Sequence, residues 1–372
     1  MSWRRAAFLV ALAMATIMPA VGKLPDKERL AQLVANVVQP LLSDQTGAAV
    51  AVLIGDRTQF FNYGWADRQH DARMTSDSLF NLASIRKVFE AVLIANSVER
   101  GELSLDDPVC RYVTELQRGG DIRHITIGQL ATHTSGLLLP QDHPPWPEHG
   151  YSLSEFLATL NRWQADAEQA PGKQHIYTHA GYVLLQLALE RRFQKPIAEL
   201  LQERVIGPLN LHSTVLPMRD KDGRAALPPP LMARAVQGYS ETDERIGKPG
   251  DQQTYYHFPG TGQMFSSARD LAAFVAANLG ERPVDPTLRK SLRRAQQDLF
   301  AISPRNGQAL AWEVNYNNNP PIVEKNGGLN NSSTYIGLIP EQHLGIVILT
   351  NRGNQNPAEA GRVILHALSA PD

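Results

Sequence analysis

The pattern of hydrophobic and polar residues divides this chain into two sheet-forming ends and a helical middle. Residues 26–42 carry apolar side chains at the three- and four-residue spacing of an amphipathic helix. A continuous apolar run at 48–54 and an aromatic-rich run at 59–65 follow, with a Gly-Asp pair between them. The amino end therefore predicts a helix followed by an antiparallel hairpin.

Helical spacing dominates the middle of the chain. After residue 84 the apolar positions recur at helical intervals up to Arg100 and Gly101, which predicts a helix that ends there. Further helices are predicted at 125–132, 153–163, 182–193 and 197–205.

Strand patterns return near the carboxyl end. A helix is predicted over 267–279, with Ser266 or Ser267 as its cap, and a final helix over 357–368. Strands are predicted between these helices, at 310–315, 333–339 and 345–350. Strands at both ends around a helical middle indicate an α+β fold, in which one antiparallel sheet flanked by helices carries an inserted helical domain.

These elements group into two predicted domains. Residues 23–80 and 255–372 form an α/β domain with the antiparallel sheet, and residues 81–254 form a mainly helical domain. We expect the active site in the cleft between them. At 372 residues, of which 43% are hydrophobic and 20% charged, the chain is long enough for two globular domains of medium size.

Charge is balanced over the whole chain. Thirty-six basic residues stand against 37 acidic ones, for a formal net charge of -1. Such a chain has no overall field that would attract nucleic acid or an anionic membrane. We therefore expect neither as a partner, and predict a monomer that acts on a small molecule.

The amino terminus has the features of an export signal. Arg4 and Arg5 precede an apolar run over 6–18, and small residues follow up to Gly22. This order predicts a cleavable signal peptide at residues 1–22 and a periplasmic protein. No later segment offers the roughly 18 uninterrupted apolar residues of a membrane span, so we expect none after cleavage. The alternative is an uncleaved anchor.

Three clusters of polar residues carry candidate chemistry. Ser84 and Lys87 stand three residues apart at the start of a predicted helix, so they share one face. A lysine in a dry pocket can take the proton of a serine hydroxyl, and a helix amino end stabilises the oxyanion that develops in acyl transfer. A spacing of three also occurs by chance, so this motif depends on its partners.

The second and third clusters supply those partners. Tyr177 and His179 lie two apart before an apolar helix, where nearby lysines would favour a phenolate that moves protons. Lys325 precedes Asn326 and two glycines on or beside a strand, and we expect an edge strand whose lysine meets a substrate carboxylate. Taken singly, Tyr177 also fits a packed aromatic and Lys325 a solvated surface lysine.

Together the clusters resemble those of a known family. Ser-Ile-Arg-Lys at 84–87, Tyr-Thr-His at 177–179 and Lys-Asn-Gly at 325–327 are similar, in order and separation, to the S-x-x-K, Y-x-N and K-T-G elements of serine β-lactamases and penicillin-binding proteins. The chain most resembles class C β-lactamases, and the likeness covers almost all of the mature chain. Supporting segments are Leu-Ala-Thr-His-Thr-Ser-Gly at 130–136 and the stretch 335–351.

The resemblance implies a hydrolase that works through a Ser84 acyl-enzyme. Lys87 and Tyr177 would move the protons, and the N–H groups of Ser84 and Gly328 would form the oxyanion hole. Substrate-binding roles are implied for several further residues: Lys325 and Asn356 with the substrate carboxylate, His179 and Asn326 at the altered motif positions, and Gln141 with the substrate amide. The serine mechanism requires no cofactor.

Departures from the family pattern bear on the substrate. His179 replaces an asparagine and Asn326 a threonine, and an imidazole ordinarily changes charge near pH 6.5. We therefore expect an atypical β-lactam range that includes carbapenems. Alternatives are a D-alanyl-D-alanine carboxypeptidase, endopeptidase or esterase that acts on a peptidoglycan-like substrate, and a penicillin-binding sensor without turnover.

Histidines near Tyr177 raise the alternative of a metal site. His175 and His179 flank the tyrosine, and His143 and His149 lie in a proline-rich loop. Grouped imidazoles can bind zinc, so His175 and His179 are candidate ligands.

Overall fold

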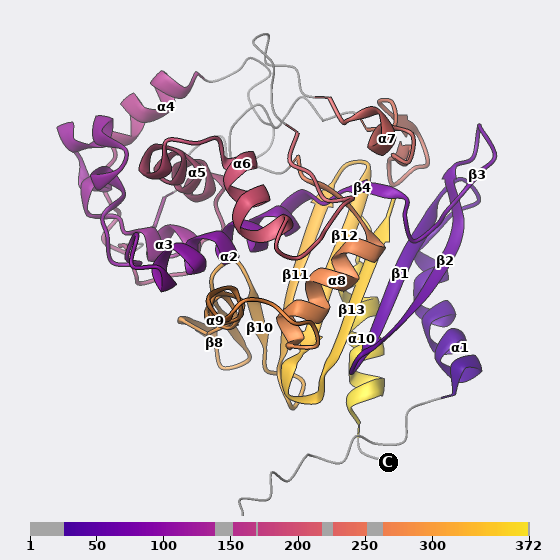
Figure 1. Cartoon of the computed structure of the whole chain (residues 1–372). Helices are drawn as coiled ribbons and strands as arrows, with labels where there is room; N and C mark the ends of the chain where they lie inside the picture. The colour runs from indigo at the N-terminus through magenta and orange to yellow at the C-terminus, as the bar shows by residue number, and fades with distance from the viewer. Residues whose placement is uncertain (1–25, 138–151, 169, 218–225, 251–262, 371–372) are drawn as a thin grey trace, which may run out of the picture.

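The computed structural model describes residues 26–137, 152–168, 170–217, 226–250 and 263–370. It shows one large antiparallel sheet with helices on both faces and a group of helices beside it (Figure 1). The predicted α+β fold, with a sheet flanked by helices, is confirmed. The predicted signal peptide at residues 1–22 lies outside the described residues.

Both ends of the chain contribute to the main sheet. Its nine strands run in the order β3, β2, β1, β13, β12, β11, β10, β9, β8, so amino-terminal β1 lies beside carboxyl-terminal β13. Each pair is antiparallel, and β1 with β2 forms the predicted hairpin. The strands are β1 Gly47–Ile54, β2 Arg57–Asp67, β3 Ala72–Arg73, β8 Phe300–Ser303, β9 Asn306–Gln308, β10 Glu313–Asn315, β11 Ile322–Leu329, β12 Ser332–Ile339 and β13 Leu344–Thr350.

Both faces of the central strands are buried, which explains why β1 is a continuous apolar run. Side chains at Ala48, Val50 and Val52 pack with helices α1 Lys27–Val38 and α10 Pro357–Ser369 on one face. Their neighbours in β1 belong to the other core cluster, which includes helix α8 Ala268–Leu279. Ser267 caps α8 through its side chain, as predicted.

The remaining helices gather mostly at one side of the sheet (Figure 1). A single apolar cluster runs from the α8 face of the sheet into this helical region, with the long helix α2 at its centre. The domain bounds predicted from the sequence stay a prediction. These helices are α2 Arg86–Glu99, α3 Ile127–Ala131, α4 Leu153–Leu160, α5 His179–Phe193, α6 Ile197–Leu201, α7 Pro229–Met232 and α9 Pro286–Ala295, and two short sheets pair β4 Leu79–Asn81 with β7 Phe265–Ser267 and β5 Gly238–Tyr239 with β6 Arg245–Ile246.

Two strand predictions were wrong in detail. The predicted strand at 310–315 begins only at Glu313, because Ala311 has a left-handed backbone and Trp312 N–H bonds back to the Leu310 carbonyl. Lys325 lies on β11, which is not an edge strand of the sheet because β10 and β12 flank it. The pairing of β11 with β10 ends at Glu324, however, so Lys325 and the residues after it pair with β12 alone. Strand β8, which forms the edge on that side of the sheet, and its neighbour β9 were missed because they have only four and three residues.

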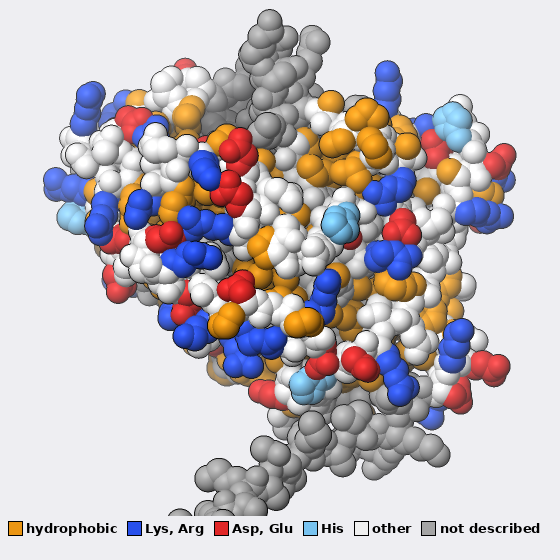
Figure 2. Space-filling model, viewed as in Figure 1, with side chains coloured by type: hydrophobic (Ala, Val, Ile, Leu, Met, Phe, Trp, Pro, Cys, Tyr) orange, Lys and Arg blue, Asp and Glu red, His pale blue; other side chains and the backbone are white. Residues whose placement is uncertain are grey.

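The visible surface agrees with the balanced charge of the sequence. Basic and acidic side chains are interspersed over the face in Figure 2, and neither sign dominates it. Among the described residues, no helix is both long and apolar enough to span a membrane.

Candidate active site

Ser84 lies on a tight turn between β4 and α2. The turn is a short 3-10 helix, Ala83–Ile85, so Ser84 precedes the α-helix proper by two residues. Ala83 has a φ of +50°, a conformation that side chains disfavour, and its N–H donates to Asn81 Oδ1 at 3.1 Å. The turn thus holds the serine at a fixed place ahead of a helix amino end.

Strand β11 approaches this turn closely, and glycine permits it. A Cβ on Gly327 would stand 2.3 Å from the Leu82 carbonyl oxygen and 3.1 Å from the Ser84 nitrogen. Only a residue without a side chain fits there without displacement of the turn. The first glycine after Asn326 therefore brings the strand's backbone beside the serine.

Ser84, Tyr177 and Lys87 form one hydrogen-bonded group. The Oγ of Ser84 lies 2.8 Å from the Tyr177 hydroxyl, and Lys87 Nζ donates to the same Oγ at 3.3 Å. Lys87 Nζ also lies 5.4 Å from the ring centroids of Tyr177 and Tyr182. The group therefore places a serine hydroxyl in contact with two side chains whose chemistry suits proton transfer.

Lys325 reaches the site from the opposite side and carries its own counter-charge. Its Nζ donates to Glu313 Oε1 at 2.7 Å and lies 5.1 Å from the Tyr177 ring centroid. Burial would lower the pKa of Lys325, but the Glu313 carboxylate and Tyr177 raise it above the ordinary value. Burial would raise the pKa of Glu313, but Lys325, together with His175 and Arg362, brings it below the ordinary value. Both Lys325 and Glu313 are therefore charged at neutral pH.

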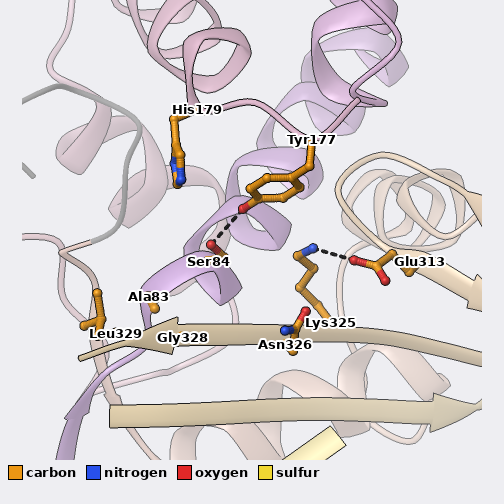
Figure 3. A pocket seen from close by; sticks show the side chains of 9 residues that line it. All are labelled: Ala83, Ser84, Tyr177, His179, Glu313, Lys325, Asn326, Gly328 and Leu329. Atoms are coloured by element: carbon orange, nitrogen blue, oxygen red, sulfur yellow. Dashed lines mark hydrogen bonds and ion pairs between the residues drawn. The ribbon is translucent and has the colours of Figure 1, made fainter. Parts of the chain in front are cut away.

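These side chains surround a cavity of about 320 Å³ (Figure 3). In Figure 3, Tyr177 and His179 point into it from the helical side, and Lys325 and Asn326 rise from β11 on the other. The structure thus brings together all three predicted clusters. The lining residues are Ala83, Ser84, Tyr177, His179, Glu313, Lys325, Asn326, Gly328 and Leu329.

The surroundings of Tyr177 favour its ionised form. Burial of the hydroxyl would raise its pKa, although 38% of the residue is exposed. The ammonium groups of Lys87 and Lys325, together with the hydrogen bond to Ser84, outweigh that effect and bring the pKa below its usual value. A phenol so placed is suited to accept the serine proton.

His179 is the first residue of α5, and its charge behaviour differs from the prediction. Burial, followed by Lys87 and Lys325, lowers the pKa of His179 to about 3. The expected change of charge near pH 6.5 was wrong, because burial disfavours a charged imidazole and the two lysine ammonium groups repel it further. His179 is a neutral imidazole at physiological pH.

His133 supports Tyr177 from behind. Its ring lies 4.3 Å from the ring of Tyr177 and 5.2 Å from that of Tyr182, centroid to centroid. Its Nδ1 accepts the Thr178 N–H at 3.3 Å, and burial holds its pKa well below the usual range. The neutral ring therefore fixes the backbone that follows the tyrosine.

Of the predicted substrate contacts, Asn356 does not reach the cavity. Asn356 is exposed and caps α10, where its Oδ1 accepts the Glu359 N–H at 3.3 Å and its Nδ2 donates to that carboxylate. It is absent from the cavity lining. Gln141, with His143 and His149, lies outside the described residues.

Comparison with known proteins decides the family. A family model described as Beta-lactamase matches residues 34–370. The chain belongs to the beta-lactamase family. Its fold is that of class C β-lactamases, and it is a serine hydrolase of that kind.

Three similar proteins illustrate this β-lactamase-family relationship. A β-lactamase of Escherichia coli K12 is 29% identical, with 92% of this chain and 94% of that protein covered. The D-alanyl-D-alanine-carboxypeptidase/endopeptidase AmpH of the same strain is 25% identical, over 83% and 80%. A solved β-lactamase/D-alanine carboxypeptidase from Pseudomonas syringae is 27% identical, with a TM-score of 0.79 over 92% of this chain and all of that one.

The described residues of this β-lactamase-family chain do not include a cluster of zinc ligands. Within the part that the structure describes, no group of three or more His, Cys, Asp or Glu side chains is placed to hold a metal. His175 lies 5.9 Å from His133, ring to ring, and its pKa is lowered chiefly by burial. Among the described residues, His175 and His179 therefore have no third ligand beside them of the kind that a zinc site needs.

Sequence reasoning missed Glu313 and the buried pair of Arg86 and Glu90. Glu313 follows an apolar run at 309–312, and its contact with Lys325 arises only because β10 pairs with β11. Arg86 and Glu90 were read as part of a helix pattern, although their four-residue spacing and opposite charges are a signal for an ion pair.

Proposed function

We propose that this protein is an exported, periplasmic serine β-lactamase that hydrolyses the lactam amide through a Ser84 acyl-enzyme. The observation that carries this proposal is the contact of Ser84 Oγ with both Tyr177 and Lys87, 2.8 and 3.3 Å away, at the wall of a cavity. The β-lactamase names of the relatives support the substrate class. The Arg4–Arg5 apolar segment supports export.

In the proposed reaction, Ser84 Oγ bonds to the lactam carbonyl carbon while its proton passes to the Tyr177 and Lys87 pair. The carbon–nitrogen bond then breaks and that proton goes to the leaving nitrogen, which gives an ester on Ser84. Water adds to the ester, the pair takes the water's proton, and Ser84 leaves with it. The N–H groups of Ser84 and Gly328 stabilise the oxyanion in both steps.

The altered motif positions support an atypical substrate range. His179 presents a neutral ring where the family has an amide, and Asn326 presents an amide where the family has a hydroxyl. The larger imidazole narrows the cavity beside Ser84, which favours β-lactams with a compact side chain, such as carbapenems, over those with a bulky one.

A D-alanyl-D-alanine carboxypeptidase or endopeptidase activity is the second candidate. The names of AmpH and of the Pseudomonas syringae protein favour it, because both are similar to this chain over most of its length. The same nucleophile and base serve either acyl transfer.

One experiment separates these candidates. The mature protein is incubated in turn with a penicillin, a carbapenem, an acyl-D-alanyl-D-alanine peptide and a neutral ester, and product and intact mass are followed. Turnover of β-lactams above the peptide and ester supports the proposal. Turnover of the peptide alone would favour the peptidase, and a persistent adduct without product would favour a sensor.

His179 is expected to leave the pH profile unchanged between pH 5 and 8. Because its pKa lies at about 3, the ring is neutral throughout this window and gains a proton only in strong acid. The profiles of kcat/KM for wild type and His179→Asn should therefore have the same shape and differ in height. A limb near pH 6.5 that disappears in the variant would contradict this.

Glu313→Gln is expected to tighten the binding of carboxylate-bearing substrates. The glutamate holds Lys325 at 2.7 Å and repels a substrate anion, so its neutralisation should lower KM for a penicillin by about fivefold. A neutral ester serves as the control and should keep its KM. An equal change for both substrates would show that the effect is not electrostatic.

A further inference from the structure

A buried ion pair lies on α2 immediately beside Lys87. Arg86 is 2% exposed and the side chain of Glu90 is fully buried, and Arg86 Nε donates to Glu90 Oε1 at 2.6 Å. Removal of two charged side chains from water costs more than their attraction commonly returns, and apolar residues would fill this space without that cost. The pair therefore calls for a role other than stability.

Glu90 lies on the helical side that carries the reactive groups. Ser84, Lys87 and Glu90 follow one another at intervals of three, so the carboxylate stands about one turn beyond the ammonium. Glu90 does not line the cavity, and its Oε2 is buried without a hydrogen-bond partner among the described residues. A group in this place has its charge as the means by which it can affect the site.

The carboxylate is held by charges from two helices. Burial, with a smaller contribution from Glu190 of α5, raises the pKa of Glu90 above its ordinary value. Arg86 and then Lys87 act in the opposite direction and favour the ionised carboxylate. Arg86 also donates to Gln186 at 2.5 Å, and Gln186 in turn donates to Glu190 at 2.9 Å. Arg86 and Glu90 thus form a nearly neutral unit at the centre of this network.

The proton-transfer pair already faces several cations and rings. Lys325 of β11 lies across the Tyr177 ring from Lys87, with Glu313 as its counter-ion. An uncompensated Arg86 would add a third cation. The other titratable groups that interact with Lys87 are Tyr182 and His179 of α5, and His133 after α3.

We propose that Glu90 is a positioning residue that neutralises Arg86 and so sets the electrostatic potential at Lys87 and Tyr177, the pair that takes the Ser84 proton. This inference rests on the proposed serine mechanism. A net positive charge at this pair favours the deprotonated form of the base, and a net negative charge favours the protonated form. In the wild-type protein the Arg86–Glu90 pair is nearly neutral and therefore favours neither form of the base.

The test measures the rate at which Ser84 is labelled by a fluorophosphonate, followed by intact mass from pH 4 to pH 9. Glu90→Gln leaves Arg86 uncompensated and should shift the acid limb to lower pH by about one unit. Arg86→Gln keeps an amide donor, leaves the carboxylate uncompensated and should shift the limb to higher pH. Ser97→Ala, a buried and uncharged position of α2 whose hydroxyl donates to the Leu93 carbonyl, is the control and should keep the wild-type limb.

Shifts of the acid limb in opposite directions in Glu90→Gln and Arg86→Gln support the inference. If Glu90→Gln does not fold, a shift of the limb to higher pH in Arg86→Gln supports it alone. Unshifted limbs with reduced rates would overturn it, because they would show a structural role alone, and the serine mechanism would stand. A wild-type protein that is never labelled at Ser84 would overturn the proposed function and the inference with it.

Discussion

Ser84→Ala is expected to lower kcat/KM for the best β-lactam by at least about 10⁴-fold. The substitution removes the atom that contacts both Tyr177 and Lys87 and leaves the surrounding turn in place. The measurement is steady-state hydrolysis of the substrate that the wild-type protein turns over fastest.

Ser97→Ala is the matched control for this variant. Ser97 is a buried residue of α2, the helix that follows Ser84, and its hydroxyl donates to the Leu93 carbonyl at 2.9 Å. We expect its turnover to stay close to wild type, with a loss of about 1 kcal/mol in the free energy of unfolding. Substantial turnover in Ser84→Ala would exclude this serine as the nucleophile.

Tyr177→Phe is expected to lower kcat by about 10²- to 10⁴-fold, the range that a general base contributes. The phenylalanine ring keeps its place against His133, while the oxygen 2.8 Å from Ser84 is lost. Because the two lysines lower the pKa of Tyr177, the wild-type rate should rise at a pH below the ordinary phenol range, and the variant should lack that rise.

Tyr182→Phe separates this role from ring packing. Tyr182 is buried against His133, and its hydroxyl donates to the Ala131 carbonyl at 3.1 Å, away from Ser84. We expect it to lose about 1 kcal/mol in the free energy of unfolding and little turnover. Equal losses of kcat in the two phenylalanine variants would show that Tyr177 acts only through packing.

The spacing of apolar residues predicted the elements that bury one regular face or a whole strand. The hairpin β1–β2, the helix that follows Ser84 and the cap at Ser267 were all readable, because a repeated apolar spacing or a local side-chain bond decides each of them. Strands β8 and β9 could not be predicted, since they have only four and three residues, too few to show an apolar pattern.

The site shows the same division. The motif residues Ser84, Tyr177 and Lys325 were found from the sequence because their order resembles a family pattern. Glu313, the partner of Lys325, was not found from the sequence. It reaches Lys325 only because β10 pairs with β11 in a register that sets Glu313 opposite Glu324. The charge state of His179 could not be predicted either, since it depends first on burial and then on two lysines that are distant in sequence.

The central claim is a covalent bond between Ser84 and the acyl group of a β-lactam. Its most direct test is the intact mass of the protein, quenched in acid within milliseconds to seconds of mixing with a slowly hydrolysed β-lactam, followed by peptide mapping. We predict a transient mass increase equal to the whole substrate, located on the peptide that contains Ser84 and absent from Ser84→Ala. Hydrolysis without such an adduct, or an adduct at another residue, would contradict the mechanism.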